Sequence, residues 1–476
     1  MNRFASIMTT LVVAAITVGC GCNDATERRI DSLISQMTLE EKIGQLNQIS
    51  HYNTDAMCRE VAAGNIGSIL NLVDPVEINK IQKAAVEESR LGIPMVFARD
   101  VIHGFRTIFP IPLGQAASFD PEIVEKGARI AAQEAVASGV RWTFSPMVDI
   151  SRDNRWGRIA ESFGEDPYLT SELALAMLRG YEQNDKPLAA CAKHFVGYGA
   201  SEGGLDYAPI HITERELRNY YLPPFEALAK AGCMTLMPSF NDNDGIPSAG
   251  NKFLLMDVLR GEWGWDGCVV SDWGSVGGML NHGFAADMKE ASKRALTAGT
   301  DVDMMSYAYI NNLKELVESG ELSEKVLDES VRNILRLKFR LGLFENPYVD
   351  MEQYEGAFYT PEALEAAREA AVKSAVLLKN DNNTLPLSAK TKRILVAGPL
   401  AKAPHDQLGT WVFDGEKSHT VTPLQALMEN YGDRVKVGYS DILSYSREEC
   451  SKAELALFTA QAASYDAVVL FLGEES

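Results

Sequence analysis

The stretch that decides the fold is residues 188–204, LAACAKHFVGYGASEGG, in which a short apolar run ends directly in a lysine and a histidine. An apolar run without alternation is typical of a strand buried on both faces of a parallel sheet. Similar runs occur at residues 66–70, 94–98, 142–148, 234–238, 268–271 and 300–304, and helix-like segments lie between them. With residues 188–193, seven predicted strands alternate with helices. This pattern predicts a (β/α)8-type, TIM-like barrel in which one strand is not recognised.

The predicted barrel domain covers residues 27–345 of an α/β protein. Residues 346–370 belong to an aromatic, acidic region with little periodicity, which we interpret as a linker. Residues 371–476 predict a second α/β domain, with strands expected at residues 376–378, 393–397, 435–437 and 467–471. This domain looks incomplete because the chain stops just after its last strand. A doubly wound sheet is the alternative for the first domain, but no GxGxxG motif supports it.

Composition and charge exclude several classes of function. Hydrophobic residues make up 46% and charged residues 23% of the chain, as in ordinary soluble enzymes, which argues against a disordered or multi-span membrane protein. The net charge of −20 repels phosphate backbones, so we expect no nucleic-acid partner. The seven cysteines contain no CxxC pair, and the histidines no HExxH motif. We therefore predict no metal and no cofactor, and interpret Cys191, Cys233 and Cys268 as buried core residues.

The N-terminal residues 1–22 read as an export signal rather than as part of the fold. Arg3 precedes a short apolar run at residues 7–19, which is too short to span a bilayer. The sequence TVGC at residues 17–20 is similar to a bacterial lipobox, so Cys20 is a candidate for lipidation and membrane anchoring. A simple cleaved signal is the alternative. Either reading predicts an exported protein that is periplasmic or anchored to a bacterial membrane.

Polar side chains follow several of the predicted strands. They are the pairs Arg99-Asp100 and Lys193-His194, the run Ser271-Asp272-Trp273, and the aspartates Asp301 and Asp303. The carboxyl ends of barrel strands meet at one mouth, where barrel enzymes place their reactive groups. Charged groups there cost desolvation unless they are paired or bind a ligand. The pattern predicts a polar ligand site, and internal salt bridges such as Asp100 with Arg158 are the alternative.

Aromatic residues accompany these charges, and they point to a sugar as the ligand. They are Trp156, Phe195, Tyr198, Phe240 and Trp273. Hydroxyl groups of a sugar need donors and acceptors, whereas the C–H face of its ring packs on aromatic side chains. Each aromatic residue alone is more typical of a core position than of a sugar-binding surface. Trp273 is the exception, because it directly follows a strand-end aspartate.

Several long motifs resemble glycoside hydrolase family 3, in particular its bacterial two-domain, periplasmic β-glucosidase-like members. The matching segments are residues 37–46 (MTLEEKIGQL), 100–114 (DVIHGFRTIFPIPLG), 144–169 (FSPMVDISRDNRWGRIAESFGEDPYL), 193–204, 254–273 (LLMDVLRGEWGWDGCVVSDW) and 374–387 (SAVLLKNDNNTLPL). They occur in the order of the family and cover the chain from about residue 27. The resemblance implies a TIM-like barrel followed by an α/β sandwich, of which this chain holds a part.

The resemblance also implies an activity. It suggests a retaining glycoside hydrolase that releases terminal β-D-glucose from β-glucosides or oligosaccharides through a covalent glycosyl-aspartate intermediate. Asp272 matches the nucleophile, and cations such as Lys193 or Arg158 would keep it ionised. The sugar-binding residues implied by the motifs are Asp100, Arg158, Lys193, His194, Met237, Phe240 and Trp273, the last as a wall of the next subsite.

Departures from the family pattern leave the general acid unassigned. Residues 205–208, LDYA, lack the Asp-Ser-His triplet of the single-domain members. In two-domain members the acid is a glutamate after the strand that here ends at Gly473, which would place it just past Ser476. Glu474 and Glu475 lie close to that position but too early. We therefore expect this chain to carry the nucleophile without its general acid.

Two alternative functions remain at this point. One is a β-xylosidase or α-L-arabinofuranosidase of the same family. The other is a non-catalytic glycan-binding lipoprotein, for which Asp272 would have no purpose. The sequence does not indicate an oligomeric state.

Overall fold

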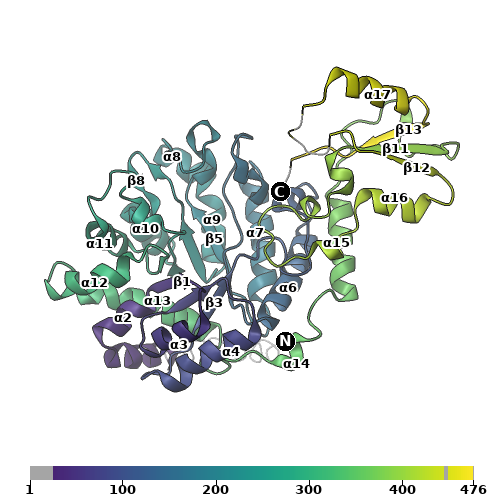
Figure 1. Cartoon of the computed structure of the whole chain (residues 1–476). Coiled ribbons are helices and arrows are strands. Elements are labelled where there is room, and N and C mark those ends of the chain that lie inside the picture. Colours follow the sequence, from purple (N-terminus) through teal and green to yellow (C-terminus); the bar gives the residue numbers. More distant parts are fainter. Residues whose placement is uncertain (1–24, 444–446, 448, 475–476) are drawn as a thin grey trace, which may run out of the picture.

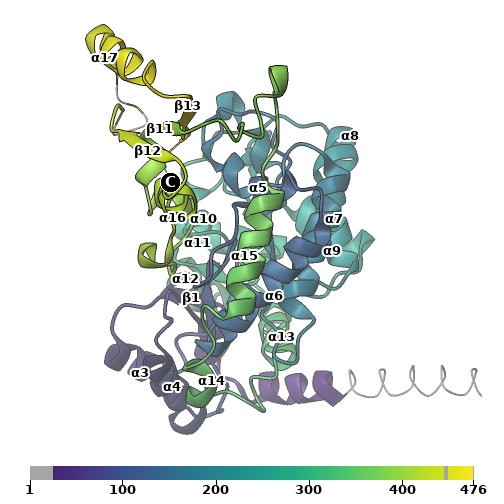
Figure 2. The same ribbon diagram turned by 90° about the vertical axis from the view of Figure 1, so that its right-hand side faces the viewer.

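The computed structural model describes residues 25–443, 447 and 449–474. The predicted signal with Cys20 and the candidate Glu475 lie outside the described residues. Figures 1 and 2 show a large α/β unit, a smaller α/β unit beside its upper edge, and helix α15 (Pro361–Lys373) between them.

The large unit is built on a curled parallel sheet of TIM-barrel type, as predicted. Eight of the described strands form it: β1 (Asn47–Ser50), β2 (Ser68–Leu70), β3 (Val96–Arg99), β4 (Trp142–Thr143), β5 (Cys191–Phe195), β6 (Thr235–Pro238), β9 (Cys268–Val269) and β10 (Asp303–Met304). They pair in the orders β10-β1-β2-β3-β4 and β5-β6-β9. Parallel bridges at Trp142–Ala189 and Val270–Val302 join the two groups into a ring.

Strand β1 is the one that the sequence pattern did not reveal. Its sequence, NQIS, is mostly polar, although Asn47 and Gln48 are buried. The other seven strands lie within or next to the predicted apolar runs, because those side chains pack on both faces of the sheet. Cys191, Cys233 and Cys268 are buried, as predicted.

Helices surround the ring, and most of them bury an apolar side against it. The α-helices described are residues 25–36, α2 (Leu39–Gln45), α3 (Thr54–Ala62), α4 (Pro75–Lys83), α5 (Pro112–Ala116), α6 (Pro121–Ala137), α7 (Pro167–Glu182), α8 (Glu214–Glu216), α9 (Pro223–Lys230), α10 (Ser275–Gly278), α11 (Met288–Ala298), α12 (Ala308–Glu318) and α13 (Glu324–Arg340). Three π-helices, at Ala84–Glu88, Leu217–Tyr221 and Phe253–Glu262, adjoin them. Helix α2 begins with the capping box formed by Thr38 and Glu41, in which each side chain accepts a backbone N–H of the other residue.

The segment predicted as a linker is partly helical. It contains α14 (Met351–Tyr354), and α15 runs through the expected domain boundary at residue 370. The alanines Ala363, Ala366 and Ala370 of α15 are buried against the barrel unit, and Lys373 forms an ion pair with Asp120 at the start of α6 (2.7 Å). Small side chains on one side of the helix allow this close packing, which a count of apolar residues does not reveal.

The smaller unit has a three-stranded parallel sheet in the order β12 (Lys436–Ser440), β11 (Arg393–Ala397), β13 (Ala467–Leu470). Helices α16 (Pro423–Tyr431) and α17 (Lys452–Ala462) lie on opposite sides of this sheet in Figure 1. The strand predicted at residues 376–378 is wrong. A strand needs a neighbour for its backbone hydrogen bonds, and none of the described strands pairs with this segment.

Candidate active site

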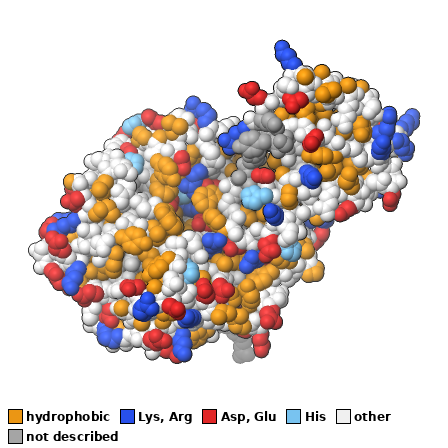
Figure 3. All heavy atoms as spheres, viewed as in Figure 1, with side chains coloured by type: hydrophobic (Ala, Val, Ile, Leu, Met, Phe, Trp, Pro, Cys, Tyr) orange, Lys and Arg blue, Asp and Glu red, His pale blue; other side chains and the backbone are white. Residues whose placement is uncertain are grey.

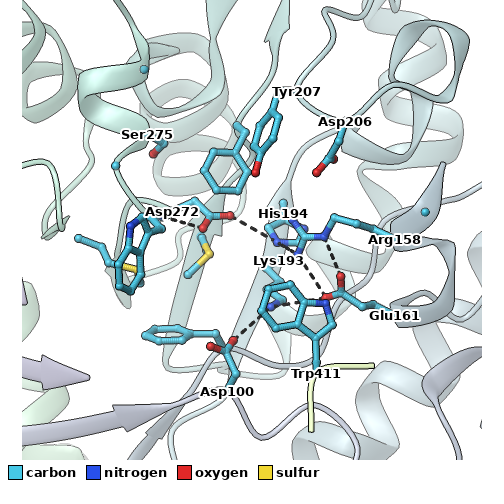
Figure 4. A pocket seen from close by; sticks show the side chains of 18 of the residues that line it. Asp100, Arg158, Glu161, Lys193, His194, Asp206, Tyr207, Asp272, Ser275 and Trp411 are labelled. Atoms are coloured by element: carbon cyan, nitrogen blue, oxygen red, sulfur yellow. Dashed lines mark hydrogen bonds and ion pairs between the residues drawn. The ribbon is translucent and has the colours of Figure 1, made fainter. Parts of the chain in front are cut away.

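A cavity of about 1040 Å³ opens at the carboxyl ends of the barrel strands. All eight residues predicted as site residues line it: Asp100, Arg158, Lys193, His194, Met237, Phe240, Asp272 and Trp273. They come from different strands and from the loops that follow them, and Figure 4 shows their charged members converging on one space. The barrel thus brings together side chains that lie far apart in the sequence.

Asp272 stands in the loop that follows β9, and one of its oxygens has no hydrogen-bond partner. Oδ1 accepts the backbone N–H of Trp273 (2.7 Å). Oδ2 is buried, and none of the described groups donates a hydrogen bond to it. Burial raises the pKa of Asp272 to about 6, although the cations Arg158 and Lys193 oppose the shift. The carboxylate is therefore mostly ionised at neutral pH.

His194 lies beside this free oxygen, but it does not donate to it. Its Nε2 is 3.5 Å from Asp272 Oδ2 and 3.0 Å from Arg158 Nη2. Arg158 can only donate, so Nε2 must be the acceptor and the ring proton lies on Nδ1. Nδ1 is 2.8 Å from Asp149 Oδ2 and donates to it. Burial, with the nearby cations, holds the pKa of His194 well below its usual range, so the ring is neutral.

A buried chain of charges forms the other side of the cavity. Arg158 Nε donates to Glu161 Oε1 (2.7 Å), and Lys193 Nζ lies 3.8 Å from Glu161 Oε2 and 3.6 Å from Asp100 Oδ1. The alternative of an Asp100–Arg158 salt bridge is therefore wrong. Glu161 follows Arg158 by three residues in the 3-10 turn Gly157–Glu161, so Glu161 rather than Asp100 pairs with the guanidinium.

The predicted aromatic residues divide into two groups. Phe240 and Trp273 line the cavity, and the Trp273 side chain is 48% exposed. Trp156, Phe195 and Tyr198 are fully buried and do not line it. The first two are therefore placed to meet a ligand, whereas the other three are core residues.

Asp301 and Asp303 do not belong to the site, contrary to the prediction from strand ends. Asp301 accepts hydrogen bonds from Arg260 (2.8 Å) and from the backbone N–H of Val269 (2.8 Å). Asp303 accepts the backbone N–H of Ala308 at the start of α12 (2.7 Å). Both carboxylates satisfy donors within the barrel wall.

Sequence reasoning missed Asp149, Glu161 and Trp411. The first two lie inside the family-like segment 144–169, so their position in that motif was the available signal. Trp411 belongs to the smaller unit, and no local pattern links it to the barrel. Glu474 is exposed and is not among the residues that line the cavity.

The described residues hold neither a cluster suited to a metal ion nor a helix suited to span a membrane. No group of three or more His, Cys, Asp or Glu side chains in residues 25–474, apart from the undescribed positions, is placed to hold a metal ion. Within the same part of the chain, every helix is too short or too polar to cross a membrane.

Comparison with known proteins identifies the family. Residues 38–337 match the glycosyl hydrolase family 3 N-terminal domain, and residues 375–476 match its C-terminal domain. A periplasmic β-glucosidase of Salmonella typhimurium is 39% identical over 88% of this chain, and a β-xylosidase of Formosa agariphila is 34% identical over 98% of it. These matches cover 56% and 64% of the two relatives, so the chain spans little more than half of their length.

Solved structures agree with this result. The crystal structure of a β-glucosidase from Listeria innocua in complex with glucose has a TM-score of 0.87 and 42% sequence identity to this chain. The match covers 94% of this chain and 64% of that one. A mutant of the same enzyme was solved with laminaribiose. Because the N-terminal family model alone matches well over half of its residues, the chain belongs to glycosyl hydrolase family 3.

Proposed function

We propose that this chain carries the nucleophile and the sugar-binding site of a retaining β-glucosidase. The observation that carries the proposal is Asp272 Oδ2, a buried carboxylate oxygen that lines the cavity and has no donor among the described groups. A structural carboxylate would be satisfied by hydrogen bonds. A nucleophile instead needs a free lone pair next to the anomeric carbon.

The proposed reaction has two steps. Asp272 Oδ2 attacks the anomeric carbon, a C–O bond forms on one face, and the bond to the leaving group breaks on the other. Water then attacks the same carbon, breaks the glycosyl-aspartate bond and gives glucose with its original configuration. The leaving oxygen takes its proton from a general acid, a role that we assign to no residue described here. An activated phenolate leaves without one.

The remaining residues of the cavity would bind the sugar. Asp100, Lys193, His194 and Arg158 offer donors and acceptors for its hydroxyl groups, and Met237, Phe240 and Trp273 offer apolar contact. Hydrogen bonds that strengthen in the oxocarbenium-like transition state would raise turnover rather than affinity alone. The β-glucosidases among the similar proteins favour glucose as the sugar. The β-xylosidase relative makes a β-xyloside the second candidate.

The test is to trap the intermediate. The chain is incubated with 2,4-dinitrophenyl 2-deoxy-2-fluoro-β-D-glucoside or the corresponding xyloside, followed by intact mass measurement and peptide mapping. We expect the glucoside to add one fluoroglycosyl group to the peptide that contains Asp272. Asp272→Asn should not be labelled, whereas Asp244→Asn, at an exposed aspartate, should be. Labelling by the xyloside alone would select the xylosidase, and labelling elsewhere would refute the nucleophile.

We also propose that the protein is exported. The apolar run after Arg3 and the periplasmic relative support export, and the TVGC sequence supports lipidation of Cys20. Cell fractionation of a bacterium that expresses the chain tests both points. Cys20→Ser should move the protein from the membrane to the periplasmic fraction. If Cys20→Ser and the wild type fractionate alike, the anchor is refuted.

A further inference from the structure

A loop of the smaller unit, residues 409–416, is fastened to the mouth of the barrel. The carbonyl oxygen of Thr410 lies 2.6 Å from His103 Nε2, in a part-buried contact. Asp414 accepts two hydrogen bonds from Arg99, from Nε at 2.8 Å and Nη2 at 3.3 Å, and both side chains are largely buried. These contacts join two units that are separated by α15. We call residues 409–416 the docking loop.

Two further features hold the docking loop close to the barrel. The ring of Phe413 lies 4.5 Å from the Arg99 guanidinium carbon, on the same arginine that binds Asp414. Gly409 has a φ of 84°, and a Cβ atom there would lie only 2.7 Å from a side-chain carbon of Ile111. A glycine is therefore required at this point, both for its backbone conformation and for its close approach. The docking loop has a specific seat on the barrel.

Trp411 extends from this loop into the cavity. It lines the cavity together with Asp100 and Lys193, and 37% of it is exposed. The Arg158 guanidinium carbon lies 5.5 Å from the centre of the indole ring, and Lys193 Nζ lies 5.8 Å from it. Arg158 and Lys193 hold the pKa of the buried Glu161 carboxylate low against burial, and the Trp411 side chain contributes to this effect. Figure 4 shows the ring between Asp100 and Arg158, in front of Glu161.

We infer that Trp411 is a substrate-binding residue supplied by the smaller unit, and that the Arg99–Asp414 pair positions it. The inference rests on the proposed function and names a residue for the same site. A large aromatic ring left partly open beside two cations and a carboxylate offers a flat apolar wall next to groups that bind hydroxyls. This combination suits one terminal sugar ring, whose C–H face packs on the indole.

The position of Trp411 beside Glu161 on the cavity wall gives the indole a second effect. Glu161 sets the positions of both Arg158 and Lys193, because it contacts each of them. Trp411 thus acts on the sugar by contact and on the two cations through Glu161. Arg99 and Asp414 do not line the cavity, so their effect on a bound sugar is indirect, through the residues that they position.

The experiment compares three variants with a matched control. Trp411→Ala removes the wall, Trp411→Phe keeps a ring but removes the N–H, and Asp414→Asn weakens the docking loop. Glu429→Gln is the control, because Glu429 is an exposed residue of α16 in the smaller unit whose side chain accepts a hydrogen bond from Gln425, outside the docking loop. Affinity for the unhydrolysed analogue phenyl 1-thio-β-D-glucoside is measured by calorimetry, and kcat and KM are measured with an aryl β-glucoside. Circular dichroism checks folding.

We expect the dissociation constant to rise about tenfold or more in Trp411→Ala, as for the loss of a good aromatic contact. Trp411→Phe should bind within about threefold of the wild type, because a ring remains. Its kcat should fall, because the variant lacks the indole N–H that helps to keep Glu161 ionised. Asp414→Asn should lose affinity in the same direction as Trp411→Ala. Glu429→Gln should match the wild type.

Each contrary outcome is informative. If a folded Trp411→Ala variant binds with wild-type affinity, Trp411 is not a substrate-binding residue and the inference is overturned. If Asp414→Asn binds with wild-type affinity, the Arg99–Asp414 pair does not position Trp411. If Trp411→Ala does not fold, an unchanged kcat in Trp411→Phe overturns the link to Glu161. If the wild type binds the thioglucoside but hydrolyses nothing, the proposed function fails while the affinities still test Trp411. If the wild type does not bind it, both fail.

Discussion

Arg158 Nη2 lies 3.0 Å from His194 Nε2, and this contact decides where the histidine proton resides. Because an arginine only donates, the ring proton is on Nδ1 and is given to Asp149. Asp272 Oδ2, 3.5 Å from the same Nε2, is thus left without a donor. Two residues that never touch the reacting carbon would keep the lone pair of the nucleophile free.

Replacing Asp149 should release this arrangement. In Asp149→Ala, Nδ1 loses the acceptor that fixes the ring beside Arg158. The ring can then turn away from the Arg158 N–H, carry its proton on Nε2 and donate to Asp272. The trapping rate should fall by at least about tenfold, as when a triad histidine adopts the wrong tautomer. The acid limb of the pH profile should move to lower pH, since a donor stabilises the ionised carboxylate. An unchanged limb with a reduced rate would indicate a structural defect instead.

The pH dependence of labelling follows from the pKa of Asp272, which burial raises to about 6. The ionised form is the nucleophile, so the rate should be constant above this pH and fall about tenfold per unit below it. Lys193→Met removes a cation that lowers this pKa and leaves the Arg158–His194 contact in place, so the limb should move to higher pH. Inactivation rates with the fluoroglucoside between pH 4.5 and 8 give both curves. If the rate falls only near pH 4, the cations Arg158 and Lys193 cancel the effect of burial on the pKa of Asp272.

Because its pKa is raised, ionised Asp272 lowers the free energy of unfolding. A carboxylate with a folded pKa near 6 and an unfolded value near 3.9 destabilises the fold when it is ionised. The penalty is absent below pH 4 and complete above pH 6. Asp272→Asn should therefore raise the free energy of unfolding by roughly 2–3 kcal/mol at pH 7.5, and much less at pH 4.5. Urea denaturation at the two pH values measures this. If Asp272→Asn raises the free energy of unfolding equally at pH 7.5 and pH 4.5, the explanation by the charge of Asp272 is refuted.

Glu161 should contribute to stability in the opposite sense. Burial alone would raise its pKa, but Arg158 and Lys193 outweigh burial and hold the pKa below its usual value. Its contribution is therefore present above the unfolded pKa near 4.3 and lost as pH falls through the folded value. Glu161→Gln leaves two poorly balanced buried cations, at a cost of about 3–5 kcal/mol near neutral pH.

The matched control for Glu161 is an exposed pair. Glu262 accepts two hydrogen bonds from Arg218, both at 2.8 Å, on the surface of the barrel unit. Glu262→Gln should change the free energy of unfolding by less than about 1 kcal/mol. Similar losses in the two variants would show that burial is not what makes the Glu161 contacts important.

The smaller unit should make the protein prone to self-association. Val376, Leu377 and Leu378 are 56%, 64% and 91% exposed, and Figure 3 shows further hydrophobic side chains on this unit. Contiguous apolar surface of this kind promotes association. Leu377→Lys with Leu378→Lys should lower the apparent mass at high concentration in sedimentation experiments and leave trapping by the fluoroglucoside unchanged. If association persists, another surface is responsible.

The sequence predicted the barrel because buried parallel strands carry apolar residues on both faces. That rule failed at β1, where Asn47 and Gln48 are buried polar residues, and at residues 376–378, where an apolar run has no neighbouring strand. Hydrophobicity reports what a side chain prefers, whereas a strand also needs a partner. The second requirement is not local.

Site residues could be predicted where a family-like motif lies at the end of a strand, as at Asp100, Lys193, His194 and Asp272. The rule of polar strand ends also selected Asp301 and Asp303, because a carboxylate that caps a helix or binds an arginine has the same local pattern. Asp149, Glu161 and Trp411 depend on which loop meets which in space. Contacts between loops that are distant along the chain leave no local pattern in a single sequence.

Trp411 comes from one unit and Asp272 from the other, so a bound sugar would be a bridge between two folding units. A ligand that binds only the folded protein stabilises every part of the fold that its binding requires. Here those parts are the barrel and the docking loop. Saturating sugar should thus slow amide hydrogen exchange in the docking loop as well as in the strands of the barrel. Melting of the smaller unit would then become a reporter for occupancy of a site that lies mostly in the larger one.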